Sequence, residues 1–495
     1  MNSLRIPHSV LAAIGGVFAV AGFAPWNVFP LPVVSLALLF FLWNRTDQPR
    51  VSAGLGFAFG LGLFGAGTGW IYIALHDFGH MPAALAFLAT TLFVALLAAF
   101  PALAGYLQAK LPLPSWQRLT LLFPALWACV ELLRGYLFTG FPWLSLGYSQ
   151  VPDSPLAGYA PILGVYGVSL LLALSAGLLA LLAQQRWNRH GRRAAILLSI
   201  LWIGGAGAGM IEWTSPTGLP LKVTLLQGNI TQDEKFEEER LIGTLETYRR
   251  QVEGSDARLI VLPETALPLL RDSLPASYLD ILKSHALTHD GDVLLGAFEE
   301  QDGRYYNSMF SLGTSPSQNY RKNHLVPFGE FIPLRSVFGW LINDVLNIPM
   351  SDLSSGGEHQ PLLHLAGQHI AMNICYEDVF GEEIIRALPQ ATLLLNTSND
   401  AWYGDSSAAM QHNQISQMRA LETGRMMLRA TNTGVTSVIG NNGRILQMLP
   451  QHRETALTAQ VQGYSGATPY VVWGNMAVVV LLLAMFAAVW RWRIR

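Results

Sequence analysis

Long apolar runs separated by short polar loops fill the first 212 residues of the chain. An apolar run of about 18 residues or more is long enough to cross a bilayer as a helix. Seven such runs precede position 213 and an eighth lies near the C-terminus, at residues 8–24, 28–44, 53–75, 83–108, 119–138, 159–183, 194–212 and 471–490. The pattern predicts a multi-span α-helical membrane domain over residues 1–212 and a last, eighth transmembrane helix over 471–490. The third run is rich in glycine, which predicts close helix packing.

The pattern changes between residues 221 and 462. Short β-rich runs lie at 223–227, 259–262, 293–298, 309–312, 370–375, 392–396 and 435–439, and helical patterns at 237–253, 274–289 and 412–427. Alternating strands and helices predict an α/β layered domain with buried sheets. Asn441-Asn442-Gly443 predicts a hairpin turn near its end.

Composition agrees with a membrane protein, since 51% of the residues are hydrophobic and 13% are charged. The basic residues that flank the predicted spans fall at alternate ends of them: Arg5, Arg45, Arg50, Lys110, Arg118, Arg186, Arg189, Arg192, Arg193, Arg491, Arg493 and Arg495. The opposite short loops contain no Lys or Arg, so the positive-inside rule predicts that both termini are cytoplasmic. The 221–462 domain then lies on the other side, which in a bacterium is the periplasm. A net charge of −2 gives no reason to expect a nucleic-acid partner.

Three polar residues stand at or just after strand-like runs of this domain: Glu264, Lys322 and Cys375. Strand ends are where α/β folds place reactive groups. A carboxylate can take the proton of a thiol, and an ammonium can stabilise an oxyanion. A free cysteine is more often a small buried hydrophobe, so Cys375 alone is weak support for a nucleophile. The combination of the three residues predicts nucleophilic catalysis.

Longer motifs surround these residues. Leu262-Pro263-Glu264, the segment KNHLVPFGEFIP at residues 322–333, ICYE at 374–377 and SNDAWYG at 398–404 stand in this order along the chain. Leu262-Pro263-Glu264, the later Lys322 and Cys375-Tyr376-Glu377 resemble the nitrilase, or carbon–nitrogen hydrolase, superfamily, which has a Glu-Lys-Cys triad on an α-β-β-α sandwich. Together with the predicted spans, the motifs resemble the apolipoprotein N-acyltransferase family over essentially the whole chain.

The resemblance implies a role for each motif residue. Cys375 would be the nucleophile that carries a thioester-linked acyl group, Glu264 the general base, and Lys322 the support of the triad and of the oxyanion. Supporting or substrate-binding residues would be Glu330, Tyr376, Glu377, Asn399 and Trp402. Phe236 occupies the place where the family usually has Trp, so the indole donor is missing here.

The resemblance also implies the reaction. An acyl chain would pass from a membrane phospholipid to the α-amino group of the diacylglyceryl-cysteine of apolipoproteins, the last step of lipoprotein maturation. No cofactor and no metal are expected, and we expect a monomer in the bacterial inner membrane. The apolar segment 336–353 predicts a lid that faces the bilayer, with Phe338, Trp340, Leu341 and Ile342 as its anchors.

Two other functions compete with this interpretation. A membrane-tethered amidase acting on a small amide would share the triad and use water as the acceptor. A transporter or scaffold with a ligand-binding outer domain would need no triad, which the presence of Glu264, Lys322 and Cys375 argues against.

Overall fold

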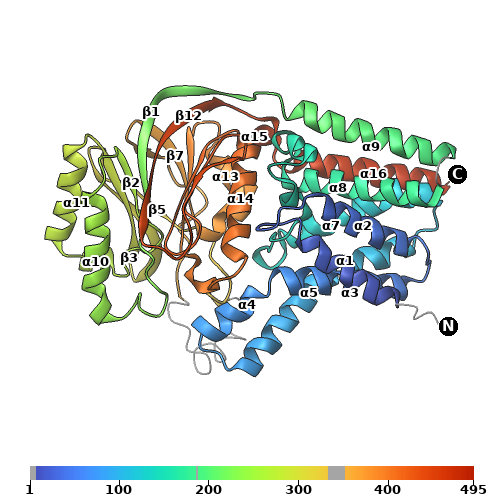
Figure 1. The fold of residues 1–495 in the computed structure, drawn as a ribbon, viewed down its shortest axis with the longest axis horizontal. Helices are drawn as coiled ribbons and strands as arrows, with labels where there is room; N and C mark the ends of the chain where they lie inside the picture. The colour runs from blue at the N-terminus through green and yellow to red at the C-terminus, as the bar shows by residue number, and fades with distance from the viewer. Residues whose placement is uncertain (1–6, 186–187, 333–351, 495) are drawn as a thin grey trace. The chain divides into compact units, whose positions relative to one another are not determined.

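A computed structural model of the chain describes residues 7–185, 188–332 and 352–494. The chain divides into two compact units (Figure 1). Unit 1 contains Met1–Tyr72, Ala83–Glu212 and Val472–Arg495, and unit 2 contains Trp213–Val471 together with the short segment Ile73–Pro82.

Unit 1 is helical. Helices form in every region where the sequence predicts a span: α1 (His8–Val20), α2 (Pro30–Trp43), α3 (Pro49–Gly67), α5 (Ala83–Ala109), α7 (Phe123–Arg134), α8 (Ala160–Gln185), α9 (Arg189–Ala208) and α16 (Met476–Ile494). Short helices α4 (Trp70–Ile73), α6 (Ser115–Gln117) and α15 (Pro469–Trp473) lie in the connections. Among the described residues, three helical stretches are both long and apolar enough to cross a membrane, namely Pro49–Gly67, Ala83–Ala109 and Pro155–Gln185.

Glycines bring the helices of unit 1 together. A Cβ added to Gly62 would overlap the carbonyl oxygen of Ala13 in α1, and one added to Gly56 would overlap that of Pro101 in α5. Because no side chain separates the backbones at these positions, α1 and α5 both pack directly on α3. The close packing predicted from the glycine-rich run is confirmed.

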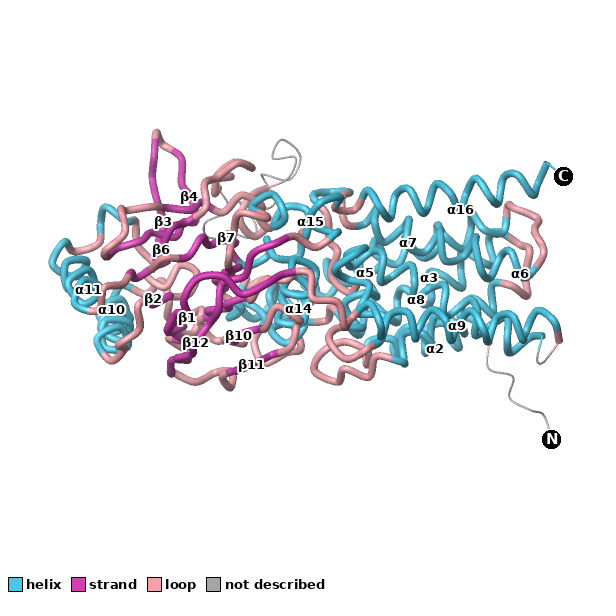
Figure 2. The backbone as a smooth tube through the Cα atoms, turned by 90° about the horizontal axis from the view of Figure 1, so that it is seen from above, coloured by secondary structure: helices cyan, strands magenta, loops and turns pink. Residues whose placement is uncertain are grey.

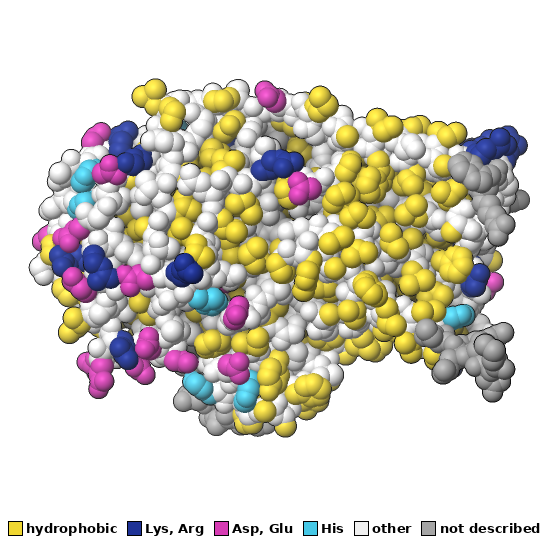
Figure 3. Space-filling view, viewed as in Figure 1, with side chains coloured by type: hydrophobic (Ala, Val, Ile, Leu, Met, Phe, Trp, Pro, Cys, Tyr) yellow, Lys and Arg dark blue, Asp and Glu magenta, His cyan; other side chains and the backbone are white. Residues whose placement is uncertain are grey.

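The two units have different surfaces. On the face shown in Figure 3, hydrophobic side chains cover the helices of unit 1, and charged side chains gather over unit 2. Exposed large hydrophobic residues such as Phe18, Phe87 and Ile203 belong to the helices of unit 1. An apolar outer surface of this kind suits contact with lipid rather than with water.

Unit 2 contains two six-stranded sheets. The first has the strand order β12-β1-β2-β3-β4-β5, and the second β11-β10-β9-β8-β7-β6. Neighbouring strands β1, β2 and β3 are parallel, as are β7, β8 and β9. The strands are β1 (Thr214–Gln227), β2 (Leu259–Val261), β3 (Asp292–Gln301), β4 (Arg304–Gly313), β5 (Asn319–Arg321), β6 (Leu363–Leu365), β7 (Gln368–Ile374), β8 (Leu393–Ser398), β9 (Met427–Thr431), β10 (Ser437–Ile439), β11 (Ile445–Met448) and β12 (Thr455–Gly466).

The sheets pack face to face and helices cover both outer faces, so unit 2 is an α-β-β-α sandwich (Figures 1 and 2). Alternate apolar residues of each strand meet between the sheets, for example Val223 and Val261 of the first with Ile374 and Leu395 of the second. Helices α10 (Glu238–Glu253) and α11 (Ala276–Thr288) cover the first sheet, and α13 (Gly381–Ile384) and α14 (Ala408–Thr423) cover the second. This is the sandwich that the motifs predict.

Some elements differ from the prediction. The helix predicted to reach residue 427 ends at Thr423, because Gly424 adopts a left-handed φ of 64° and caps it. Met427 instead begins β9. No strand was predicted at β12, which pairs with β1 along most of its length. The predicted hairpin turn is confirmed, since Gly443 has φ 75° and β10 pairs antiparallel with β11.

Candidate active site

Four loops at strand ends of the two sheets supply the candidate site. Glu264 follows β2, Cys375 follows β7, and Asn399 follows β8, so all three stand at carboxyl ends of parallel strands. Lys322 directly follows the edge strand β5. The packed core holds the sheets rigid, and the strand ends therefore fix the positions of these four residues.

Lys322 joins two carboxylates in a buried cluster. Its Nζ donates to Oε1 of Glu330 at 2.8 Å and to Oε1 of Glu264 at 3.2 Å. Asn307 Nδ2 donates to the same Glu264 oxygen at 2.7 Å, and the backbone N–H of Asn399 donates to Oε2 of Glu264 at 2.8 Å. Burial alone would lower the pKa of Lys322, but the charges of Glu264 and Glu330 outweigh it and raise that pKa well above its usual value. The two carboxylates therefore favour the charged form of Lys322.

Cys375 sits on a strained turn. It has a left-handed φ of 53°, which costs a non-glycine residue free energy and indicates a conformation imposed by its surroundings. The turn is fixed because Asn396 Nδ2 donates to the carbonyl oxygen of Cys375 at 3.0 Å. Burial raises the pKa of the Cys375 thiol well above its usual range, the Glu264 charge raises it further, and the Lys322 charge opposes both. The resting sulfur is a neutral thiol that needs a base before it can attack.

Glu377 ties the cysteine turn to the lysine loop. Its Oε1 accepts hydrogen bonds from the backbone N–H groups of Asn323 at 2.6 Å and His324 at 3.0 Å, and its Oε2 from the hydroxyl of Tyr320 at 3.0 Å. The backbone N–H of Ile374 also donates to Oε2. One carboxylate therefore holds the residues that flank Lys322 and Cys375. Burial raises the pKa of Glu377 to about 7, against the lowering effect of these donors.

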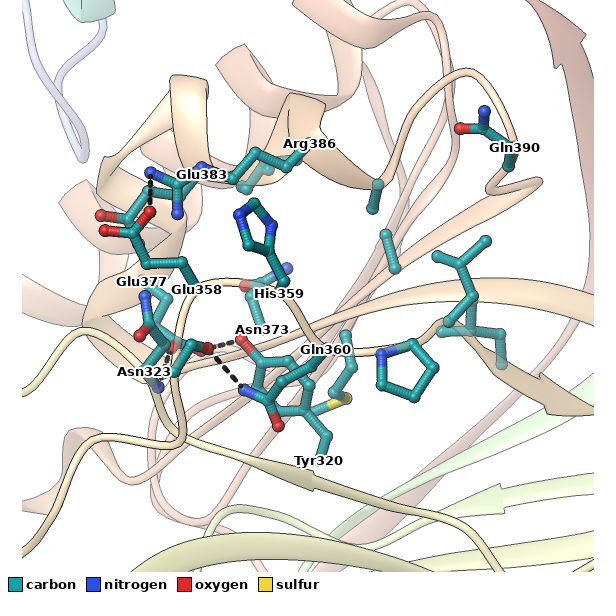
Figure 4. A pocket seen from close by; sticks show the side chains of 18 residues that line it. Tyr320, Asn323, Glu358, His359, Gln360, Asn373, Glu377, Glu383, Arg386 and Gln390 are labelled. Carbon is teal, nitrogen blue, oxygen red and sulfur yellow. Dashed lines mark hydrogen bonds and ion pairs between the residues drawn. The ribbon is translucent and has the colours of Figure 1, made fainter.

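A cavity of about 380 Å³ opens beside Glu377 (Figure 4). Tyr320, Asn323 and Asn373 line it together with Glu358 and Arg386. Of the described residues, Glu264, Lys322 and Cys375 are not in its lining. The cavity therefore borders the carboxylate that positions the loops, and it is not a chamber around the thiol.

A buried ionic network supports the Cys375 turn from the helix-covered side of the second sheet. His412 contacts Asp378 and Asp400 at 2.9 Å each through its two ring nitrogens, and Arg429 contacts the same two carboxylates at 3.1 and 3.0 Å. Burial and Arg429 work against a charge on His412, but Asp378 and Asp400 outweigh them and raise its pKa to about 9. Both ring nitrogens then act as donors. The network links the Cys375–Val379 turn, the Asp400–Tyr403 turn, α14 and β9.

The structure places the remaining predicted residues at different distances from this cluster. Tyr376 is buried, and its ring lies edge-on to His324 and Phe380. Trp402 is half-buried in the Asp400–Tyr403 turn. Phe236 is 47% exposed, whereas its neighbour Lys235 is buried. The four lid anchors Phe338, Trp340, Leu341 and Ile342 lie outside the described residues, as does most of the 336–353 segment.

Sequence reasoning missed Asn307, Lys235 and the ionic network. Asn307 lies in the middle of β4, and nothing in its neighbourhood marks it as a partner of Glu264. A signal did exist for Arg429, because an arginine inside the otherwise apolar and small run Met427–Thr431 has to find a buried partner.

The fold and site define a class, that of carbon–nitrogen hydrolase domains, and comparison with known proteins agrees. The carbon-nitrogen hydrolase family model matches residues 222–470, and the apolipoprotein N-acyltransferase N-terminal domain model matches residues 15–178. The chain is 55% identical over 469 residues to the apolipoprotein N-acyltransferase of Nitrosomonas europaea, covering 94% of each chain. It is 45% identical over 471 residues to that of Methylococcus capsulatus, covering 94% of this chain and 92% of the other. The chain therefore belongs to the apolipoprotein N-acyltransferase family.

Proposed function

We propose that this enzyme transfers an acyl chain from a membrane phospholipid, through a thioester on Cys375, to the α-amino group of the N-terminal diacylglyceryl-cysteine of apolipoproteins. The observation that carries the proposal is the buried cluster in which Lys322 bridges Glu264 and Glu330 beside the strained Cys375 turn. Family membership supports the reaction class, and the geometry supports the individual roles.

In the first half-reaction, Cys375 Sγ attacks the ester carbonyl carbon of the phospholipid. A carbon–sulfur bond forms while Glu264 takes the thiol proton, and the carbonyl oxygen gains a negative charge that Lys322 stabilises. The intermediate collapses when the ester carbon–oxygen bond breaks. Glu264 then returns its proton to the departing alkoxide, which leaves as a lysophospholipid. Asn307 and the Asn399 N–H hold the Glu264 carboxylate in place through both transfers.

In the second half-reaction, the α-amino group of the diacylated lipoprotein attacks the thioester carbonyl. Glu264 accepts a proton from the amine, an amide bond forms, and the carbon–sulfur bond breaks. The thiolate of Cys375 takes the proton back from Glu264, which restores the resting state. Donor and acceptor use one site in turn, so ping-pong kinetics are expected.

The lipid nature of both substrates supports an arrangement in the membrane. Eight transmembrane helices, a catalytic domain in the periplasm and cytoplasmic termini would place the thiol at the outer face of the bacterial inner membrane. The one-sided basic residues and the apolar helices of unit 1 support this topology. The apolar segment 336–353 would exclude water from the thioester, which hydrolysis would otherwise destroy. We propose a monomer as the working unit.

The test is to incubate the purified enzyme with a phospholipid that carries a labelled acyl chain. An adduct on the Cys375 peptide that hydroxylamine removes is the expected result. Cys375→Ser and Cys375→Ala should form no thioester adduct, whereas Cys129→Ala, which changes the other cysteine, should form it at the normal rate. A hydroxylamine-labile adduct that persists in Cys375→Ala would contradict the proposal.

A diacylated lipopeptide added to the acyl-enzyme separates this function from that of an amidase. We expect labelled triacylated lipopeptide and little free fatty acid. A hydrolase would release fatty acid at the same rate with or without the peptide. The relatives named apolipoprotein N-acyltransferase do not favour the hydrolase.

A further inference from the structure

The loop before α10 buries a second lysine near the cluster. Lys235 belongs to the turn over residues 232–236 and is 3% exposed, while the neighbouring Phe236 is 47% exposed. A lysine is almost never buried to this degree without a partner. Its position therefore needs a reason within the site.

The contacts of Lys235 lead to the general base. Its Nζ donates a short hydrogen bond to the hydroxyl of Thr265 and a longer one, at 3.4 Å, to the backbone carbonyl oxygen of Glu264. Within the described residues, no carboxylate lies within ion-pair distance of this ammonium. The same loop is tied to the site a second time, because Gln232 accepts a hydrogen bond from Asn399 Nδ2 at 2.8 Å. Lys235 is thus a buried cation held by neutral acceptors.

The charges of the site explain why such a cation is needed. Glu264 and Glu330 with Lys322 make two carboxylates against one ammonium, so these three groups carry a net charge of −1. Forming a thiolate at Cys375 within a buried, negatively charged cluster is costly. The Lys235 ammonium interacts electrostatically with both Glu264 and Cys375 and brings the sum to zero.

We infer that Lys235 is a positioning residue of the acyl-transfer site, whose buried ammonium neutralises the Glu264–Lys322–Glu330 cluster and lowers the free energy of ionising Cys375. It acts through Glu264 and Cys375 and does not itself exchange a proton with substrate. The inference rests on the proposed roles of those two residues. Burial also lowers the pKa of Lys235 to about 8, against the opposing effect of Glu264 and Cys375, so its charge is present at neutral pH and is lost in mildly alkaline solution.

The test uses the reactivity of the thiol and needs no lipid. The rate of alkylation by iodoacetamide follows the thiolate fraction, and peptide mass spectrometry can read Cys375 and Cys129 separately in the full-length enzyme. Lys235→Met keeps the length of the side chain and removes the charge. We expect it to slow Cys375 alkylation about tenfold at pH 7.5, which corresponds to about one unit in the pKa of the thiol while Lys235 is charged. The difference should shrink as the pH rises past 8, because the unaltered enzyme then loses the Lys235 charge. Lys235→Arg should restore most of the rate.

Controls separate this effect from general damage. Lys283→Met removes an exposed lysine of α11 and should leave the alkylation profile of Cys375 unchanged. Cys129 should react at one rate in all variants. Equal pH profiles for Lys235→Met and the unaltered enzyme would overturn the inference.

A second pair of variants covers the case in which Lys235→Met does not fold. Thr265→Val removes the hydroxyl that holds the ammonium, and Thr265→Ser keeps it. Valine should slow alkylation several-fold while serine should not, and equal rates in the two would overturn the inference. Because no acyl donor is used, the outcome is independent of the proposed function. Normal acyl-enzyme formation together with an unchanged alkylation profile for Lys235→Met would refute the role of Lys235 alone.

Discussion

In the proposed mechanism, both proton transfers depend on Glu264. Both of its oxygens are engaged, one by Lys322 and Asn307 and the other by the Asn399 N–H, so the carboxylate has one fixed orientation. A group held in this way can serve as base and then as acid without moving. Cys375, the proposed nucleophile, is held in a strained conformation with φ 53° by its surroundings.

We predict that Glu264→Gln lowers the rate of acyl-enzyme formation by about 10²–10⁴-fold, because the amide cannot accept the thiol proton. The measurement is the single-turnover rate of labelling of Cys375 by labelled phospholipid. Glu246→Gln is the matched control, since Glu246 is an exposed residue of α10 whose partner is Arg249. Acylation of Glu264→Gln at the normal rate would show that another group is the base.

Individual residues of the candidate site could be predicted from the sequence where they belong to a motif. The proximity of Glu264, Lys322 and Cys375 could be predicted because each follows a strand-like run inside a motif of chemically suited residues. Their catalytic roles stay predictions. Asn307 and Lys235 could not be predicted, since their contacts with Glu264 join positions 43 and 29 residues apart. Only the pairing of β3 with β4 and the fold of the 228–237 loop bring them to Glu264.

Two buried features hold neighbouring elements of unit 2 together: Glu377 and the ionic network around His412. Glu377 joins the end of β7 to the loop after β5, which belong to different sheets. The network joins α14 and β9 to the turns that follow β7 and β8. The geometry of the candidate site therefore depends on buried contacts between neighbouring elements.

Glu377→Gln should uncouple the two loops. The amide presents an NH₂ group to backbone N–H donors, so at least one donor loses its acceptor, at a cost of about 1–3 kcal/mol. We expect a lower melting temperature and a loss of acylation of at least tenfold, both measured on the purified enzyme. Glu358→Gln, which alters an exposed pair with Arg386, should change neither.

The network predicts how stability depends on pH. The pKa of His412 in the folded chain, about 9, lies above the ordinary histidine value of 6.5, so its stabilising effect is complete below pH 6.5 and is lost as the pH rises through 9. The full effect corresponds to about 3 kcal/mol. Lys235, whose pKa is lowered, changes stability in the opposite sense above pH 8.

Comparison of the unaltered enzyme with His412→Gln isolates the contribution of the His412 charge to stability. Melting temperatures measured from pH 6 to pH 10 should converge as the pH rises, because the unaltered enzyme loses an interaction that the variant never had. A constant difference across this range would mean that His412 does not carry the charge assigned to it.

Element boundaries were less predictable than element types. The helix pattern over 412–427 ran into β9 because methionine suits a helix and a strand equally, and only the left-handed Gly424 separates the two elements. β12 was missed although Leu457, Ala459 and Val461 alternate with polar residues, because this apolar set is short and includes a small alanine. Its pairing with β1 joins the two ends of the domain in sequence. Strand order has no local signature of this kind.

For the molecule as a whole, the sequence predicted the division into a helical unit and an α-β-β-α unit better than the number of membrane spans. Helices occur in all eight predicted regions, but in the described part of the chain three stretches meet the criteria of length and apolar character. α9 illustrates the difference, since Arg189, Arg192 and Arg193 lie in its first turns and lower its mean hydropathy. The topology therefore rests on where the charges lie.

The proposed topology places two lysines on opposite sides of the membrane. With the N-terminus in the cytoplasm, Lys110 follows four predicted spans and lies on the cytoplasmic side, whereas Lys283 follows seven and lies in the periplasm. Both side chains are exposed within their own units. In a Cys129→Ala, Cys375→Ser background, Lys283→Cys should react with a membrane-impermeant maleimide in cells whose outer membrane has been permeabilised. Lys110→Cys should react only after lysis. Labelling of both positions from the same side would mean that an even number of spans separates them, and the catalytic domain would then share its compartment with the basic loops.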